Sequence, residues 1–224
     1  VGKEMLELHI VGGEPTLWPK LGEFVTEIRK HIPAYITISS NGSRTLRWWE
    51  KFGTVFDKIL LSCHHKEVDI DHFIKVSDTL HEMGRSPNVM VLMDPNAWDK
   101  CLELIETCKT SKHPWFISAM EVMHETINYT DEQRAFVAKP TKRRPSIWHI
   151  WKNRKHLKDN PVVVFEDGSK KRVNRNWIVL NKQNDFYGWR CNIGVDSMMI
   201  DPAGIITGAC RTRLFDNYNI YDKD

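Results

Sequence analysis

Two glycines, a carboxylate and a proline follow the apolar residues 6–11, and these residue types in this order could hold a bound ligand. Gly12 and Gly13 have no Cβ atom, so the backbone there can approach a ligand closely. Pro15 cannot continue a strand ladder, which leaves Glu14 pointing toward whatever the strand end faces. The segment therefore predicts a binding site at the end of a strand.

The apolar runs of the chain alternate with amphipathic segments. After residues 6–11, further runs occupy residues 35–40, 58–63, 88–93 and 115–120. Between them, residues 73–83 show helical periodicity before Gly84, and residues 98–108 show it after an Asn96 that can cap a helix. Alternating strands and helices predict an α/β fold with five parallel strands.

Right-handed crossovers between these strands predict either a full or partial barrel or a doubly wound sheet. In both architectures the ligand site lies at the carboxyl ends of the strands. Besides the first segment, that edge would carry Ser40, Asn41, Gly42, Ser62, Cys63, His64, His65, Asp94, Pro95 and Glu121. Strand alternation puts Cys63 on the face packed against helices, and Ser62 and His64 on the opposite face.

Taken together, these strand ends resemble those of radical S-adenosylmethionine (radical SAM) enzymes. In that family the second barrel strand ends in Gly-Gly-Glu-Pro, the third often in Thr-Asn-Gly, and the fourth often in Ser followed by a polar residue. Here the corresponding residues are 12–15, 40–42 and 62–64. The resemblance implies a partial (β/α)6 TIM-like barrel that lacks its first βα unit and occupies residues 1–138.

The resemblance also implies a cofactor site for S-adenosylmethionine. Its members would be Gly12, Gly13, Glu14, Pro15, Ser40, Asn41, Ser62 and His64. Backbone carbonyls and the Glu14 carboxylate would accept the methionyl ammonium, and the short polar side chains would bind the ribose and the carboxylate. In this family a 4Fe-4S cluster, reduced by a protein such as flavodoxin or ferredoxin, cleaves the cofactor to a 5′-deoxyadenosyl radical. Members with extensions of this kind often modify a peptide or protein, which is the substrate class expected here.

The cysteines depart from the family pattern. The family's cluster ligands have the spacing Cys-x3-Cys-x2-Cys, which this chain lacks. We therefore expect a fragment whose cluster ligands lie upstream of Val1, and which alone could not generate the radical. Cys191 and Cys210 resemble the start of a twitch or SPASM region that binds an auxiliary 4Fe-4S cluster. Cys63, Cys101 and Cys108 are expected to be core residues.

The composition changes near residue 139, where a basic segment begins and runs to Lys158. We expect residues 139–224 to form a basic linker and a small auxiliary-cluster region. Apolar residues 162–165 and 177–180, on either side of an Asp167-Gly168 turn, predict a hairpin. A second turn is expected at residues 201–204.

Composition and charge narrow the function classes. A net charge of +3 in 224 residues is too small to predict nucleic-acid binding by itself. No apolar run approaches the roughly 20 residues that span a bilayer. Five cysteines, an odd number, fit a reducing cytoplasm better than a disulfide framework. His9 and the pair His64-His65 could suggest a mononuclear metal site, but no third ligand at a diagnostic spacing supports that interpretation.

Two alternatives to the radical SAM interpretation stay open. One is a barrel enzyme without iron that binds a phosphorylated metabolite through residues 12–13 and 41–42. The other is a module that binds RNA or an acidic protein through the basic segment, with Trp148 and Trp151 as stacking platforms.

Overall fold

The computed structural model of the chain describes residues 6–66, 68–110, 115–119, 127–138, 162–164, 167–172, 175–182, 199–201 and 205–207. The chain divides into two compact units, residues 1–183 and 184–224. The domain boundary predicted near residue 139 falls outside the described residues and stays a prediction.

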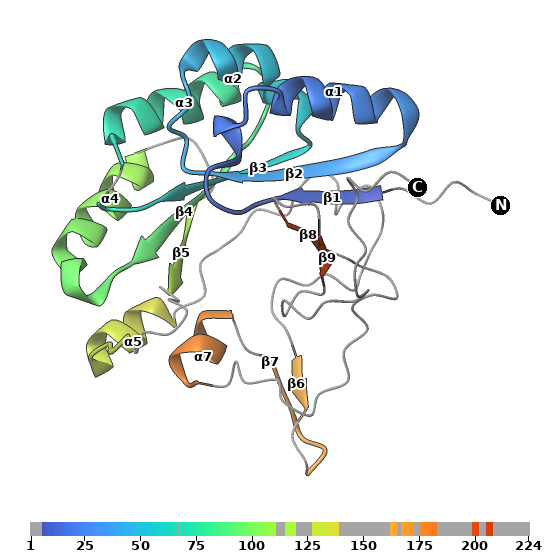
Figure 1. Cartoon of the computed structure of the whole chain (residues 1–224). Coiled ribbons are helices and arrows are strands. Elements are labelled where there is room, and N and C mark those ends of the chain that lie inside the picture. Colours follow the sequence, from blue (N-terminus) through green and yellow to red (C-terminus); the bar gives the residue numbers. More distant parts are fainter. Residues whose placement is uncertain are drawn as a thin grey trace. The chain divides into compact units, whose positions relative to one another are not determined.

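Five strands of the first unit form one parallel sheet in the order in which they occur along the chain (Figure 1). They are β1 (Leu6–Ile10), β2 (Ala34–Ser40), β3 (Lys58–Cys63), β4 (Asn88–Met93) and β5 (Trp115–Ala119). Each bound lies within one residue of the predicted run, so the predicted α/β fold is confirmed. A doubly wound sheet reverses its strand order at a switch point, and the order of these five strands does not reverse.

Four helices join successive strands of this sheet. They are α1 (Leu21–His31), α2 (Leu46–Phe52), α3 (Ile70–Glu82) and α4 (Trp98–Thr110), and short 3-10 turns accompany them at η1 (Pro15–Leu17), η2 (Gly53–Val55) and η3 (Pro95–Ala97). Helix α3 ends as predicted, because Gly84 has a φ of +78°. The cap predicted at Asn96 is wrong. The Asp94 carboxylate accepts the Asn96 N–H at 2.9 Å and caps η3, which leads into α4.

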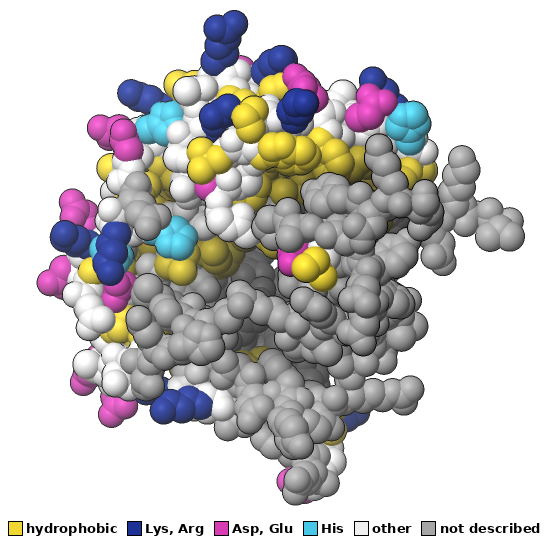
Figure 2. Space-filling model, in the orientation of Figure 1, with side chains coloured by type: hydrophobic (Ala, Val, Ile, Leu, Met, Phe, Trp, Pro, Cys, Tyr) yellow, Lys and Arg dark blue, Asp and Glu magenta, His cyan; other side chains and the backbone are white. Residues whose placement is uncertain are grey.

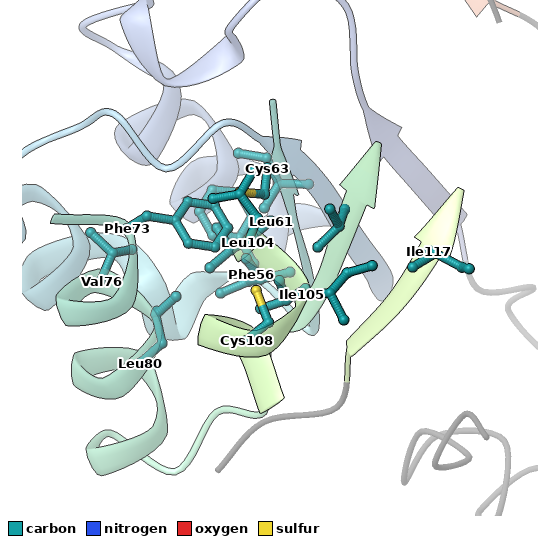
Figure 3. Close-up of a cluster of buried hydrophobic side chains, with 14 of the residues drawn as sticks. Phe56, Leu61, Cys63, Phe73, Val76, Leu80, Leu104, Ile105, Cys108 and Ile117 are labelled. Carbon is teal, nitrogen blue, oxygen red and sulfur yellow. The ribbon is translucent and has the colours of Figure 1, made fainter. Parts of the chain in front are cut away.

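The core lies between the sheet and these helices (Figure 3). On β3, Ile59, Leu61 and Cys63 are buried, while Leu60 and Ser62 are only half-buried. Helix α3 contributes Phe73, Val76 and Leu80 to the same cluster, and α4 contributes Leu104, Ile105 and Cys108. The alternation predicted for β3 is thus confirmed.

The three described cysteines, Cys63, Cys101 and Cys108, are fully buried core residues outside any disulfide, as predicted. Burial raises the pKa of the Cys63 thiol to about 12 and that of Cys108 to about 11. Because the thiolate is the reactive form, these cysteines serve packing and not nucleophilic chemistry.

Beyond β5, helix α5 (Asp131–Val137) is followed by the antiparallel hairpin of β6 (Val162–Val164) and β7 (Lys170–Arg172), and by helix α7 (Arg175–Leu180). A hairpin was predicted here, but its second strand was wrongly placed at residues 177–180. Gly168, with a φ of +79°, turns the chain at once, so residues 170–172 pair with β6. A run of four apolar residues has no period that separates a strand from a buried helix.

In the second unit, β8 (Met199–Ile200) pairs with β9 (Ile206–Thr207) in an antiparallel ladder. The Asp201 carboxylate accepts the Ile205 N–H at 2.9 Å across the predicted turn. Cys191 and Cys210, the predicted auxiliary-cluster ligands, lie outside the described residues, so they stay a prediction. The same holds for Glu121, which was predicted at the ligand edge of the sheet. None of the described helices is long and apolar enough to span a bilayer.

Candidate functional site

A cleft of about 340 Å³ opens at the carboxyl ends of β1, β2 and β3. Its wall is formed by Gly12, Gly13, Glu14, Ser39, Ser40, Asn41, Ser62 and His64. The structure therefore brings together all of the predicted cofactor residues except Pro15, which begins η1 beside the cleft. Ser39 is the wall residue that the sequence interpretation missed, although alternation along β2 places it on the same face as Ser62 of β3.

The two glycines of the wall have backbone conformations that other residues rarely adopt. Gly12 has a φ of +96° and Gly13 a φ of +49°. A Cβ atom added at either position would meet no protein atom within 4 Å. Glycine is thus needed here for the turn itself, and the space beside the turn is open to a ligand.

The Glu14 carboxylate makes hydrogen bonds on both of its oxygens. Oε1 accepts from the Thr16 N–H at 3.0 Å, the Thr16 hydroxyl at 2.6 Å and the Ser40 hydroxyl at 2.8 Å. Oε2 accepts from the Asn41 N–H at 2.6 Å. The sequence predicted that Glu14 points toward whatever the end of β1 faces, and in the structure its carboxylate joins the end of β1 to the end of β2.

The loop that follows β2 is ordered by its own side chains. The Ser40 hydroxyl accepts the Gly42 N–H at 3.0 Å, and the Asn41 side-chain carbonyl accepts the Ser43 N–H at 2.9 Å. Gly42 has a φ of +75°, and a Cβ atom there would lie 3.2 Å from the Phe73 ring. The loop is thus held in one conformation beside the cleft.

On the β3 side, the Ser62 hydroxyl lies 3.4 Å from Nε2 of His64, and both residues face the cleft. A hydroxyl and an imidazole can each donate or accept a hydrogen bond. This side can therefore bind neutral polar groups of a ligand, such as sugar hydroxyls.

The wall carries little positive charge. Glu14 is its one carboxylate, and no Lys or Arg is among the described residues that form it. The hydroxyl side chains of the wall can bind neutral polar groups of a ligand, and its described residues offer no Lys or Arg side chain to a phosphate. Within the described ranges, no group of three or more His, Cys, Asp or Glu side chains could hold a metal ion.

A second cleft, of about 250 Å³, lies beside the loop after β2 and was not predicted. Its wall consists of Asn41, Gly42, Ser43, Thr45, Val68, Asp69, His72 and Phe73. Asn41 is common to both clefts. The Asp69 carboxylate caps α3 by accepting the His72 N–H at 3.1 Å. Nε2 of the His72 ring is hydrogen-bonded to the Arg44 main-chain carbonyl at 2.9 Å.

No known protein-family profile matches the chain. Among curated proteins, it is similar to one named as a probable GTP 3′,8-cyclase of Thermoplasma volcanium, with 31% identity over 114 residues. The match covers 45% of this chain and 35% of the relative, so the chain spans about a third of the length of the relative that it matches. This match supports a distant relationship to radical SAM enzymes, the class to which that cyclase belongs.

Proposed function

We propose that the chain is part of a radical SAM enzyme and that the larger cleft binds S-adenosylmethionine. The observation that carries the proposal is the composition of the described cleft wall, which combines two left-handed glycines, a carboxylate and short hydroxyl side chains without a Lys or Arg. The distant relationship to a GTP 3′,8-cyclase supports the same class.

The wall fits the two ends of this cofactor. The amino acid end carries an ammonium, which can donate hydrogen bonds to the main-chain carbonyls of residues 12–13. The ribose carries hydroxyls, for which Asn41, Ser62 and His64 offer donors and acceptors. When bound beside a reduced 4Fe-4S cluster, the cofactor would supply a 5′-deoxyadenosyl radical that removes hydrogen from a substrate. This chain's residues would hold and orient the cofactor, and the cluster ligands would come from outside the described residues.

A further βα unit next to β1 would complete the proposed partial barrel. β1 is at the edge of the described sheet, and exposed apolar side chains follow it along the chain. Val11, Leu17, Trp18 and Phe24 are each at least 42% exposed, and the Trp18 and Phe24 rings lie 5.2 Å apart. Figure 2 shows hydrophobic side chains gathered beside α1. Such a patch is typical of a surface that another element covers.

Maleimide labelling of an introduced cysteine tests whether another βα unit covers these exposed apolar side chains. Leu17→Cys should react quickly with a maleimide in this chain, and at least about tenfold more slowly in a longer protein that includes a preceding βα unit. Equal rates in the two proteins would contradict the covered edge.

The phosphorylated-metabolite alternative is less well supported, because the described wall of the cleft has no cationic side chain. The basic segment of the RNA alternative lies outside the described residues. The auxiliary cluster on Cys191 and Cys210, the peptide or protein substrate, the flavodoxin or ferredoxin reductant and a cytoplasmic location remain parts of the proposal.

Ligand titration of a matched pair of glycine variants tests the binding site. Gly12 and Gly84 both have positive φ angles, and a Cβ atom at either would have open space around it, but only Gly12 is on the cleft wall. Calorimetry should show saturable S-adenosylmethionine binding to the chain, lost in Gly12→Val and kept in Gly84→Val. Inorganic phosphate should not compete. Absence of binding to the unsubstituted chain, or full competition by phosphate, would contradict the proposal.

A further inference from the structure

We infer that Glu14 is a positioning residue, which sets the location of Asn41 and the loop after β2 instead of binding the ligand with its carboxylate. The identity of the ligand rests on the proposed function, whereas the positioning itself is a property of the ligand-free protein. Three observations lead to this inference.

The first observation is that protein donors occupy the carboxylate. Oε1 accepts three hydrogen bonds and Oε2 accepts one, all between 2.6 and 3.0 Å. An ionised carboxylate offers about four acceptor positions. Oε1 is therefore fully occupied, and Oε2 keeps at most one acceptor position beside the Asn41 N–H. Gly12 and Gly13, by contrast, stand on the cleft wall in a conformation with open space around it.

The second observation is where the β1–β2 ladder stops. The paired residues run from Leu6 with Ala34 to Ile10 with Ile38, and no paired position follows among the described residues. Past this point the bonds from Ser40 and Asn41 to Glu14 connect the two chain segments across 26 and 27 residues. The carboxylate therefore continues the connection between the strands after the backbone pairing has ended.

The third observation is that the same bonds order the loop. Ser40 is 3% exposed, and its hydroxyl donates to Glu14 while accepting the Gly42 N–H. Asn41, whose N–H binds Oε2, is on the wall of both clefts. A change at Glu14 therefore alters the shape of two clefts through one loop, in addition to any effect on charge.

Amide hydrogen exchange in the ligand-free full chain tests the positioning. In Glu14→Gln the side-chain amide would present an N–H to the Asn41 N–H, so this bond is lost while an oxygen remains for Thr16 and Ser40. Exchange at the Asn41 amide should become about tenfold faster or more, since bonds to charged groups are strong. Glu50→Gln, at an exposed position of α2, should leave it unchanged. Unchanged Asn41 exchange in Glu14→Gln would overturn the inference.

Two nucleosides separate positioning from direct contact. S-adenosylmethionine carries the ammonium, and 5′-methylthioadenosine lacks the whole amino acid part. If Glu14 positions Asn41 and its loop, Glu14→Gln weakens binding of both compounds by a similar factor. If only S-adenosylmethionine binding is weakened, Glu14 contacts the ammonium and the inference is wrong. If neither compound binds the unsubstituted chain, the proposed function fails, and Asn41 exchange still decides the role of Glu14.

Discussion

Nε2 of His65 lies 3.6 Å from a carboxylate oxygen of Asp94, and both side chains are more than nine-tenths buried. Asp94 directly follows β4, and its other oxygen accepts the Asn96 N–H at 2.9 Å. His65 directly follows His64 on the wall of the larger cleft. Asp94 thus holds two loops at the ligand edge of the sheet, one at the end of β3 and one at the end of β4.

Asp94→Ala should lower the free energy of unfolding by about 2–4 kcal/mol, because it removes a cap and leaves a buried imidazole without its carboxylate. Asp94→Asn should cost less, since an amide oxygen can keep the cap. Urea denaturation measures both. Asp99→Ala, at an exposed position in the first turn of α4, is the control and should cost less than about 1 kcal/mol. Equal losses at the two aspartates would contradict the role of Asp94.

Gly22→Ala should destabilise the protein even though alanine favours a helix by about 1 kcal/mol over glycine. A Cβ atom at Gly22, in α1, would lie 2.3 Å from the Phe52 ring of α2. We expect a net loss of about 1–3 kcal/mol in urea denaturation. In a Phe52→Ala background the same change should be neutral or stabilising. A loss of the same size in that background would show that the ring is not the cause.

The Cys63 thiol should make stability depend on pH in the alkaline range. Its pKa is raised from 9.0 to about 12, mainly by burial. Between these values the unfolded chain loses the proton and the folded chain keeps it, so the contribution is complete below pH 9 and falls as pH rises toward 12. The unfolding free energy of the unsubstituted protein should therefore fall more steeply above about pH 9 than that of Cys63→Val. Parallel curves for the two proteins would contradict the shift.

Asn176 should be important for stability although it lies in the short helix α7. Its side-chain carbonyl accepts the Ala119 N–H at 3.0 Å, and its side-chain amide donates to the Ile117 and Val137 carbonyls, both at 3.1 Å. Asn176→Ala should lower the unfolding free energy by about 2–3 kcal/mol, because it leaves partly buried backbone groups of β5 and α5 without these partners. Asn181→Ala, at an exposed position of the same region, should change it by less than about 1 kcal/mol.

Much of the fold could be predicted from the sequence, because each strand of a buried parallel sheet is a short run of mostly apolar residues. The bounds of β3 and β4 agree with the predicted runs at both ends. The secondary-structure prediction failed where the local sequence is compatible with two structures. Residues 177–180 form part of a helix and not a strand, because their environment decides between the two. Asp94 and Asn96 could each cap a helix, and only the backbone conformation at residue 94 selects the first.

The candidate site was predicted to the extent that it depends on strand ends. Gly12, Asn41 and Ser62 lie at or next to the carboxyl ends of three different strands, and parallel pairing brings such residues to one edge. The bonds from Glu14 to Ser40 and Asn41 could not be predicted, because they depend on the register of β1 against β2 and on the turn at the glycines. The second cleft could not be predicted either, since it lies between a loop and the start of α3 and has no motif of its own.

Because the strands follow one another in the sheet as they do along the chain, the wall of the larger cleft comes from one early stretch of the sequence. Every described residue on its wall lies between positions 12 and 64, and the strands that carry these residues are the first three described. A chain is synthesised from its N-terminus, whereas a domain generally folds as a unit. The ribosome therefore delivers the complete described wall of the cleft before it has made α3, α4 or β5, and the later elements add the hydrophobic support behind a wall whose parts are already present.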